Sequence, residues 1–148
     1  MKKRIYLFTI ALISLIFISS SCKKEEENIE ESAGVIFSVN GDDAWSTKNV
    51  STKDNTSNFV ITATKDNYKL VLTIKELKVG KYYLDDTKNT ATYTSGGKEF
   101  IASKSHDNYI EIKGMHTDGK TFAGAFSFTS ISADANIKSI HGSWDNVK

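Results

Sequence analysis

Proline is absent from this 148-residue chain, and cysteine occurs only once. A secreted domain that relied on disulfides would carry an even set of spaced cysteines, so the composition excludes a disulfide scaffold. Without proline, tight turns must be made by Gly, Asn and Asp, which tolerate positive φ. A capped segment with 3.6-residue apolar periodicity is also missing, and this absence predicts strands in place of helices.

Residues 1–21 are predicted to be a signal peptide. A positive segment at residues 2–4 is followed by an apolar run at residues 5–18, interrupted only by Thr9 and Ser14. This run is shorter than the about 20 residues that a membrane-spanning helix needs. A cleaved signal is therefore the stronger interpretation, and a permanent span is the weaker one.

The single cysteine, Cys22, is predicted to be the lipidated first residue of the mature chain. Three serines at residues 19–21 precede it, which is the layout of a lipobox. Ser19 departs from the usual pattern, where Leu, Val or Ile stands, so an ordinary secretory signal is the alternative. Two or three acyl chains on Cys22 would make the bilayer a permanent partner of the chain.

Residues 22–32 are predicted to form a charged, flexible tether. Two lysines and five glutamates follow Cys22, with Ile29 as the single apolar residue, and such composition cannot bury enough surface to offset chain entropy. The Lys24-Glu25-Glu26 segment resembles the signal that sends Bacteroidota lipoproteins to the outer face of the outer membrane. That resemblance implies a cell-envelope location, anchored to the outer membrane and facing the exterior; a solvated spacer is the alternative.

A strong excess of basic charge is missing as well. Cleavage of the signal would remove three of the 19 basic residues and none of the 18 acidic residues. The mature chain would then be slightly acidic, whereas proteins that bind nucleic acid normally show a basic surplus. We therefore expect no nucleic-acid partner.

Residues 33–148 are predicted to be a single all-β domain, an antiparallel β-sandwich or flattened β-barrel of about 8–10 short strands. Apolar residues alternate along residues 35–39, and the pattern recurs along the chain up to residues 122–128, where Phe and Gly share one face. Asn40-Gly41 is a strong hairpin signal. The polar stretch 46–58 is interpreted mostly as loop, and Gly142 as a bulge or bend in the last strand.

No constellation of residues indicates catalysis or metal binding. His106, His116 and His141 fall on different predicted elements, without the short spacing that zinc ligands usually have. A Gly-x-Ser-x-Gly elbow is missing, and the carboxylate pairs at residues 42–43 and 85–86 lie in predicted turns. We expect no catalytic residue, no cofactor and no metal, with an enzyme of unfamiliar type as a minor alternative.

Aromatic residues are the only candidates for ligand contact. Their rings stack on sugars or anchor a protein partner, although β domains also use them in the core and as cross-strand pairs. Tyr82 and Tyr83 are adjacent in a predicted strand and must point to opposite faces, so one of them should be exposed. The six candidates are Trp45, Tyr82, Tyr83, Tyr93, Tyr109 and Trp144.

Four segments carry a family resemblance. They are Val-Asn-Gly-x-x-x-Trp at 39–45, Val-Gly-Lys-Tyr-Tyr-Leu at 79–84, Gly-Ala-Phe-Ser-Phe at 124–128 and Gly-Ser-Trp-Asp-Asn-Val at 142–147. With the Cys-Lys-Lys-acidic tether, they resemble small Bacteroidota lipoproteins whose domains have unknown function. Trp144 stands where members often carry phenylalanine. The resemblance implies a cellular location and a fold, and it assigns no functional residues.

Two hypotheses for function follow. The first is a non-enzymatic binding or accessory module, tethered at the membrane, whose partner is a glycan, a protein or an envelope component. The second is a calycin-like barrel with an internal cavity for a small apolar ligand. The second hypothesis requires an apolar lumen that Phe122, Phe126 and Phe128 do not fill.

Overall fold

The computed structural model describes residues 34–42, 44–85, 87–117 and 121–148. Cys22 and the predicted signal peptide and tether lie outside these residues. Every regular element in the described part is a strand, which confirms the predicted all-β class. The strands are β1 (Gly34–Val39), β2 (Trp45–Thr47), β3 (Val50–Asn55), β4 (Asn58–Lys65), β5 (Tyr68–Ile74), β6 (Gly80–Tyr83), β7 (Thr90–Ser95), β8 (Lys98–Ala102), β9 (Tyr109–Met115), β10 (Phe122–Ser132) and β11 (Ile137–Val147).

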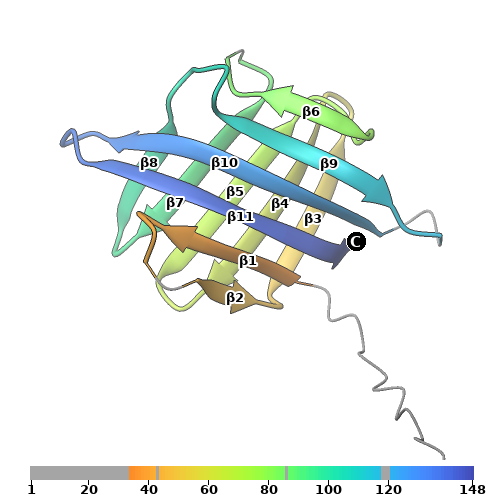
Figure 1. Cartoon of the computed structure of the whole chain (residues 1–148), viewed down its shortest axis with the longest axis horizontal. Coiled ribbons are helices and arrows are strands. Elements are labelled where there is room, and N and C mark those ends of the chain that lie inside the picture. The colour runs from red at the N-terminus through yellow and green to blue at the C-terminus, as the bar shows by residue number, and fades with distance from the viewer. Residues whose placement is uncertain (1–33, 43, 86, 118–120) are drawn as a thin grey trace, which may run out of the picture. The chain divides into compact units, whose positions relative to one another are not determined.

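The strands form one antiparallel sheet in the order β2-β1-β11-β10-β8-β7-β5-β4-β3, with β9 beside the first half of β10 and β6 beside β9. Figure 1 shows β1, β9, β10 and β11 crossing in front of β3, β4, β5 and β7. The described residues contribute eleven strands to this sheet, slightly more than expected, because β3 and two of the three residues of β2 arise from the stretch interpreted as loop.

The two ends of this order nearly meet, because β2 and β3 are consecutive in the chain. The backbone N–H of Thr64 on β4 donates to the carbonyl of Asn49 at 3.0 Å. The Thr47 hydroxyl donates to the carbonyl of Thr64 at 2.7 Å. The sheet is therefore a nearly closed, barrel-like sheet, as one of the two predicted architectures requires.

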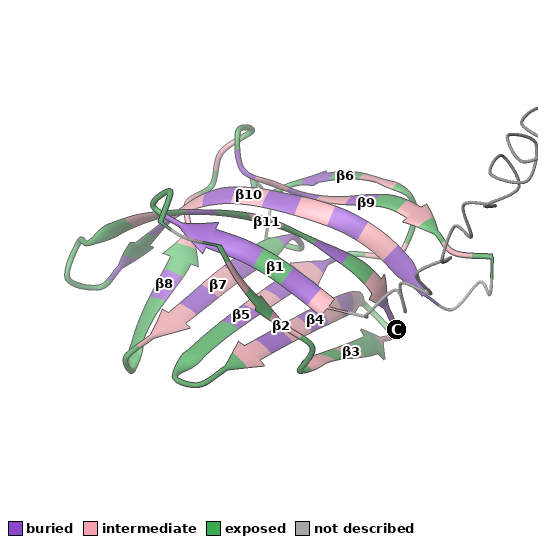
Figure 2. Ribbon diagram, turned by 60° about the horizontal axis from the view of Figure 1, so that its bottom comes forward, coloured by how far each residue is buried: buried purple, intermediate pink, exposed green. Residues whose placement is uncertain are grey.

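Side-chain alternation places the core as the sequence predicts. In β1, Val35, Phe37 and Val39 are buried, and in β10 buried and half-buried positions alternate from Phe122 onward. Figure 2 shows this alternation along β10. The Asn40-Gly41 turn also forms, with positive φ at both residues, as a type I′ turn requires, and the Asp42 N–H donates to the Val39 carbonyl at 3.1 Å. No helix of the described residues is long and apolar enough to cross a membrane.

The interpretation of residues 46–58 as loop is wrong. Six of these residues form β3, which pairs along its length with β4, for example Thr52 with Ile61. β3 stands at the end of the strand order and exposes much of its surface. Polar side chains are tolerated there because pairing with β4 fixes the backbone. The preference of a residue type for β-strands is only a weak guide to whether it lies in one.

Of the bulge or bend predicted at Gly142, the bulge is wrong. Gly142 pairs regularly with Phe37 on β1 and with Phe126 on β10. A Cβ at this position would overlap the Ile36 carbonyl oxygen and the side chain of Phe37. Gly142 thus makes room for core rings in a regular ladder, and the irregularity in register lies instead next to Gly124 on β10.

Candidate functional site

The structure separates the six candidate aromatics into two groups. Tyr82, Tyr93 and Trp144 are buried, with 7%, 2% and 2% of their surface exposed. Trp45 and Tyr109 are half-buried, and Tyr83 is exposed. Tyr82 and Tyr83 therefore point to opposite faces, as predicted, while the first group offers little ring surface to a ligand.

Trp144 and Tyr82 are core residues, which corrects their selection as ligand contacts. The Trp144 ring stacks on Phe126 with centroids 6.0 Å apart. The Tyr82 hydroxyl donates to the carbonyl of Lys78 at 2.8 Å and accepts from the N–H of Lys78 at 3.2 Å. Burial raises the pKa of the Tyr82 hydroxyl. Sequence alternation predicts their inward direction but not how completely neighbouring strands cover them.

Tyr83 and Tyr109 lie on β6 and β9, where they contact polar neighbours. Tyr83 meets the His106 ring edge-on at 5.6 Å, and Lys81 lies 3.9 Å from the centre of the Tyr109 ring. His106 in turn lies 3.3 Å from Asp85. These contacts are typical of a solvated sheet surface, and they do not bring Tyr83 or Tyr109 together with Trp45 in one depression.

Trp45 does line a depression, which we name the rim cleft. Its volume is about 440 Å³, and its lining includes Trp45, Lys65, Tyr68, Tyr93, Ser95 and Lys138. β2, β4, β5, β7 and β11 contribute these residues at or near one end of each strand. The cleft therefore lies where the turns after β1, β4 and β7 meet.

Three aromatic rings line the rim cleft, those of Trp45, Tyr68 and Tyr93. Tyr68 stacks parallel to Tyr93, with centroids 6.2 Å apart and an angle of 7° between the planes. Trp45 lies 5.7 Å from Tyr68, tilted by 33°, and its other neighbour is Phe37, its cross-strand partner. Core packing thus holds Trp45 and Tyr93 in place, while Tyr68 keeps 39% of its surface exposed.

Charged groups of both signs stand around these rings. Lys65 lies 5.7 Å from the centre of the Trp45 ring, and Lys138, Asp42 and Asp66 complete the rim. Burial raises the pKa of the Tyr93 hydroxyl, against a smaller lowering by its hydrogen bond with Ser95. The cleft therefore combines apolar ring faces with ammonium, carboxylate and neutral hydroxyl groups.

Tyr68 was not among the residues that the sequence singled out. It directly follows the turn at residues 66–67, just as Trp45 follows the turn after β1. Both turns contain residues with positive φ, Asp66 and Asn40. Each of these aromatic residues is the first residue of the strand that follows a turn, and this signal would have added Tyr68 to the candidates.

Each of the three histidines contacts a different partner. His141 bonds the Ser38 hydroxyl at 2.8 Å, and His116 bonds Asp145 at 3.0 Å. Within the described residues, no group of three or more His, Cys, Asp or Glu is placed to hold a metal ion. The carboxylates of Asp43 and Asp86 lie outside the described residues.

The interior between the crossing strands is filled by aromatic rings. Phe122, Phe126 and Phe128 are each 1% exposed. Phe122 meets Phe59 at 5.3 Å and Trp144 at 6.3 Å, and Phe126 meets Phe128 at 6.1 Å. These rings occupy the space that an internal apolar ligand would need, so this packing gives no support to the calycin-like alternative.

Fold and site together define a small all-β protein with a nearly closed antiparallel sheet and an aromatic cleft at one end of its strands. Residues 31–147 match the family described as Domain of unknown function (DUF6252), and the chain belongs to that family. No curated protein and no solved structure matches the chain significantly.

Proposed function

We propose that this protein is a lipid-anchored binding protein of the cell envelope whose rim cleft binds carbohydrate. The observation that carries the proposal is the Tyr68–Tyr93 stack beside Trp45, with Tyr68 open to solvent. Aromatic faces are electron-rich, and the C–H groups on one side of a sugar ring pack against such faces. The role is non-enzymatic and requires no cofactor.

The polar rim supports a sugar over a purely apolar ligand. Lys65 and Lys138 supply donors, and Asp42 and Asp66 supply acceptors around the rings. Ligand sites generally combine an apolar surface with a few polar groups that fix orientation. Sugar hydroxyls both donate and accept hydrogen bonds, so a rim with charges of both signs suits them.

The cellular location forms the second part of the proposal. Lipidation at Cys22, anchoring in the outer membrane and display at its outer face are supported by the N-terminal sequence described above. Gly34 begins β1, whereas Val39 at the other end of β1 lines the rim cleft. The cleft is thus about 17 Å along β1 from Gly34.

Tryptophan fluorescence tests the carbohydrate part. The chain has two tryptophans, so Trp144→Phe leaves Trp45 as the only emitter. This full chain, in detergent, is titrated with maltose, cellobiose, N,N′-diacetylchitobiose and lactose. We expect a saturable change in Trp45 emission with at least one sugar, abolished by Tyr68→Ala.

Tyr83→Ala is the matched control, because Tyr83 is 41% exposed against 39% for Tyr68 and lies outside the cleft. The sugar response should survive this change. A response lost equally in both variants, or no response to any sugar, would contradict carbohydrate binding at the rim cleft.

A further inference from the structure

Strand β6 has a paired neighbour on one side only. It pairs with β9 from Gly80 to Tyr83, and within the described part of the chain no other strand pairs with it. Figure 1 shows β6 beside β9 at the margin of the sheet. A strand in this position presents a row of unpaired N–H and C=O groups. We name the side of β6 that faces away from β9 the open edge.

The hydrogen bonds of β6 show which backbone groups face the open edge. In an antiparallel pair, the N–H and C=O groups of alternate residues point toward the partner strand, and those of the residues between them point away. The Leu84 N–H, one residue past β6, donates to the Asn108 carbonyl at 2.9 Å, on the β9 side. Lys81 and Tyr83 lie three residues and one residue before Leu84, so their backbone groups face the open edge.

One of these groups already has a partner on the open edge. The Tyr83 carbonyl accepts a hydrogen bond from the Asn89 side chain at 3.2 Å, which agrees with the alternation. Within the described residues, the Lys81 N–H, the Lys81 carbonyl and the Tyr83 N–H have no such partner. The open edge therefore offers two donors and one acceptor in the spacing of an extended backbone.

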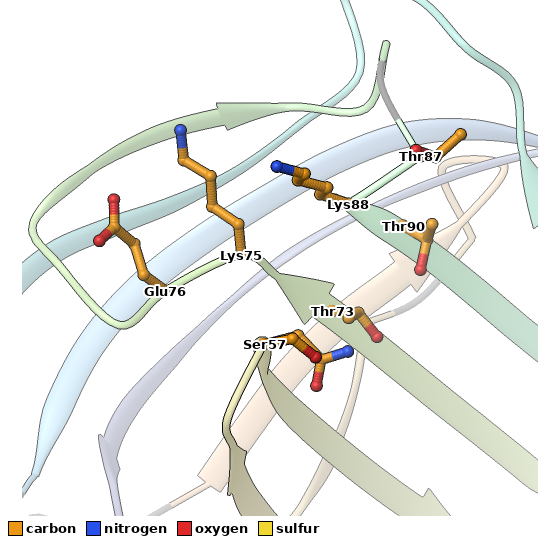
Figure 3. Close-up of a pocket in the computed structure, with 8 residues that line it drawn as sticks. Ser57, Thr73, Lys75, Glu76, Thr87, Lys88 and Thr90 are labelled. Atoms are coloured by element: carbon orange, nitrogen blue, oxygen red, sulfur yellow. The ribbon is translucent and has the colours of Figure 1, made fainter.

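A groove borders the open edge, and we name it the edge groove. Its volume is about 380 Å³. Figure 3 shows two of its lining residues, Lys75 and Glu76, where the chain leaves β5 and turns toward β6. The other wall is β6 itself, because all four of its residues line the groove.

Two buried side chains hold the walls of the edge groove in place. Asn89 accepts from the Lys75 N–H at 3.1 Å while it donates to the β6 carbonyl. The Tyr82 hydroxyl donates to the Lys78 carbonyl and accepts from the Lys78 N–H. These bonds tie the chain between β5 and β6 to the strand without using the groups that face the open edge. A site that is already ordered loses less entropy when it binds.

A second copy of the chain fits the open edge poorly. Antiparallel pairing of two β6 strands about Lys81 would place like charges directly opposite each other, which is destabilising. Pairing about Tyr82 or Tyr83 would require the Tyr83 carbonyl, which already bonds Asn89. A segment of different sequence avoids both conflicts.

The charge at the middle of the open edge belongs to Lys81. Its ammonium group lies 3.9 Å from the centre of the Tyr109 ring. Among the described residues Lys81 forms no ion pair, although Glu111 is its cross-strand partner on β9. The carboxylates in the lining, Glu76 and Asp85, already contact a lysine and a histidine. Opposite charges in a cross-strand pair are favourable, so an acidic residue complements Lys81.

We propose that β6 takes up an extended segment of a partner protein as an additional strand in the edge groove. Strand addition gains affinity from main-chain hydrogen bonds and specificity from alternate side chains. The partner residue opposite Lys81 is acidic and exchanges two backbone bonds with Lys81, and the Tyr83 N–H supplies a third. This site is separate from the rim cleft, because Tyr68 begins β5 whereas Lys75 follows its last residue.

Amide hydrogen exchange of the wild-type chain in detergent tests the open edge itself. The amides of Lys81 and Tyr83 should exchange faster than those of Tyr82 and Leu84 by about tenfold or more, because only the latter two donate to the β9 side. Equal protection of all four amides would show that the edge is covered, and it would overturn the proposal.

A phage-displayed library of random dodecapeptides, selected on the full chain in detergent, supplies the probe for binding. The selected peptides should slow exchange at Lys81 and Tyr83. Lys81→Pro removes the N–H that faces the open edge, a change that edge strands tolerate, and it should weaken binding by about tenfold or more. Thermal unfolding verifies that this variant folds, and the exchange measurement with bound peptide needs no variant.

Lys81→Ala is the matched control, because it keeps the N–H and loses only the side chain. It should weaken the peptides by no more than about fivefold, and Tyr68→Ala in the rim cleft should leave their binding unchanged. Peptides that bind Lys81→Pro as tightly as wild type, or a library that yields no binder, would overturn strand addition at β6.

Discussion

The side-chain amide of Asn108 pairs with the backbone of Thr129 as a strand residue would. Its Oδ1 accepts from the Thr129 N–H at 3.0 Å, and its Nδ2 lies 3.4 Å from the Thr129 carbonyl. Thr129 lies in the gap along β10 between the residues paired with β9, up to Ser127, and those paired with β8, from Ser130. Asn108 thus bridges the point where the sheet divides.

We predict that Asn108→Ala destabilises the fold by about 1–3 kcal/mol, because the Thr129 N–H is left buried without its acceptor. Chemical denaturation of the full chain measures this loss. Asn67→Ala, a change in an exposed turn, should stay within about 0.5 kcal/mol of wild type. Equal unfolding midpoints for Asn108→Ala and wild type would show that the amide bridge contributes nothing.

Gly124 is predicted to be intolerant of any side chain. A Cβ there would overlap the Trp144 ring and the Glu111 carbonyl oxygen, whereas a Cβ at Gly114 on neighbouring β9 would meet nothing within 4 Å. Gly124→Ala should cost about 1–3 kcal/mol through overpacking, and Gly114→Ala should be close to neutral. Thermal unfolding of both variants tests this prediction. A smaller loss of stability in Gly124→Ala than in Gly114→Ala would contradict it.

The pKa of Asp134 is predicted to lie well below that of an ordinary aspartate. Lys98 donates to its carboxylate at 2.6 Å, and hydrogen bonds from Ser132 and Asn136 lower the pKa further. Because this pKa is lowered in the folded state, the contribution of the Asp134 carboxylate to stability is complete at neutral pH. The contribution begins to decrease when the pH drops below the unfolded-state pKa of about 3.9, and it is lost as the pH falls through the folded-state pKa. The loss should stay small, because the pair is exposed.

Carboxyl ¹³C chemical shifts, followed from pH 6 to pH 2, check this value. Asp134 should remain ionised at pH 3, and Lys98→Gln should move its titration upward. An Asp134 that titrates near pH 3.9 in the wild-type chain would show that the hydrogen bonds to its carboxylate are absent in solution.

Cys22→Ala is predicted to release the protein from the membrane without unfolding it. The proposed anchor would consist of acyl chains on this residue, and each buried methylene would contribute about 0.8 kcal/mol. Incorporation of labelled palmitate and fractionation of the cell envelope measure the change. Acylated, membrane-bound protein in the Cys22→Ala strain would refute the anchor assignment.

Alternation along the chain is sufficient to predict most of the fold. It identifies the buried face of β1 through Val35 and Phe37, and that of β10 through Phe126 and Phe128, because one face of each strand is apolar. It fails for β3, where both faces are polar and only pairing with β4 specifies a strand. Strand order is not encoded in such local patterns.

The candidate site was only partly predictable, because burial at the end of a strand depends on which neighbours cover it. Trp45 and Trp144 look alike in the sequence, since each is an aromatic residue in a strand. Trp144 meets core rings from β10, whereas Trp45 stands beside the turn before Tyr68 and keeps partial exposure. The pairing of Tyr68 with Ser95 on β7, which brings Tyr68 beside Tyr93, is a long-range property.

The central claim is that the rim cleft binds carbohydrate, and a glycan array tests it most directly. Full-length chain in detergent is applied as wild type, Tyr68→Ala and Tyr83→Ala, with equal folding verified by circular dichroism. We predict that wild type and Tyr83→Ala bind the same set of glycans and that Tyr68→Ala loses them. A Tyr68→Ala variant with an unchanged binding pattern, or a wild-type chain that binds no glycan, would contradict the claim.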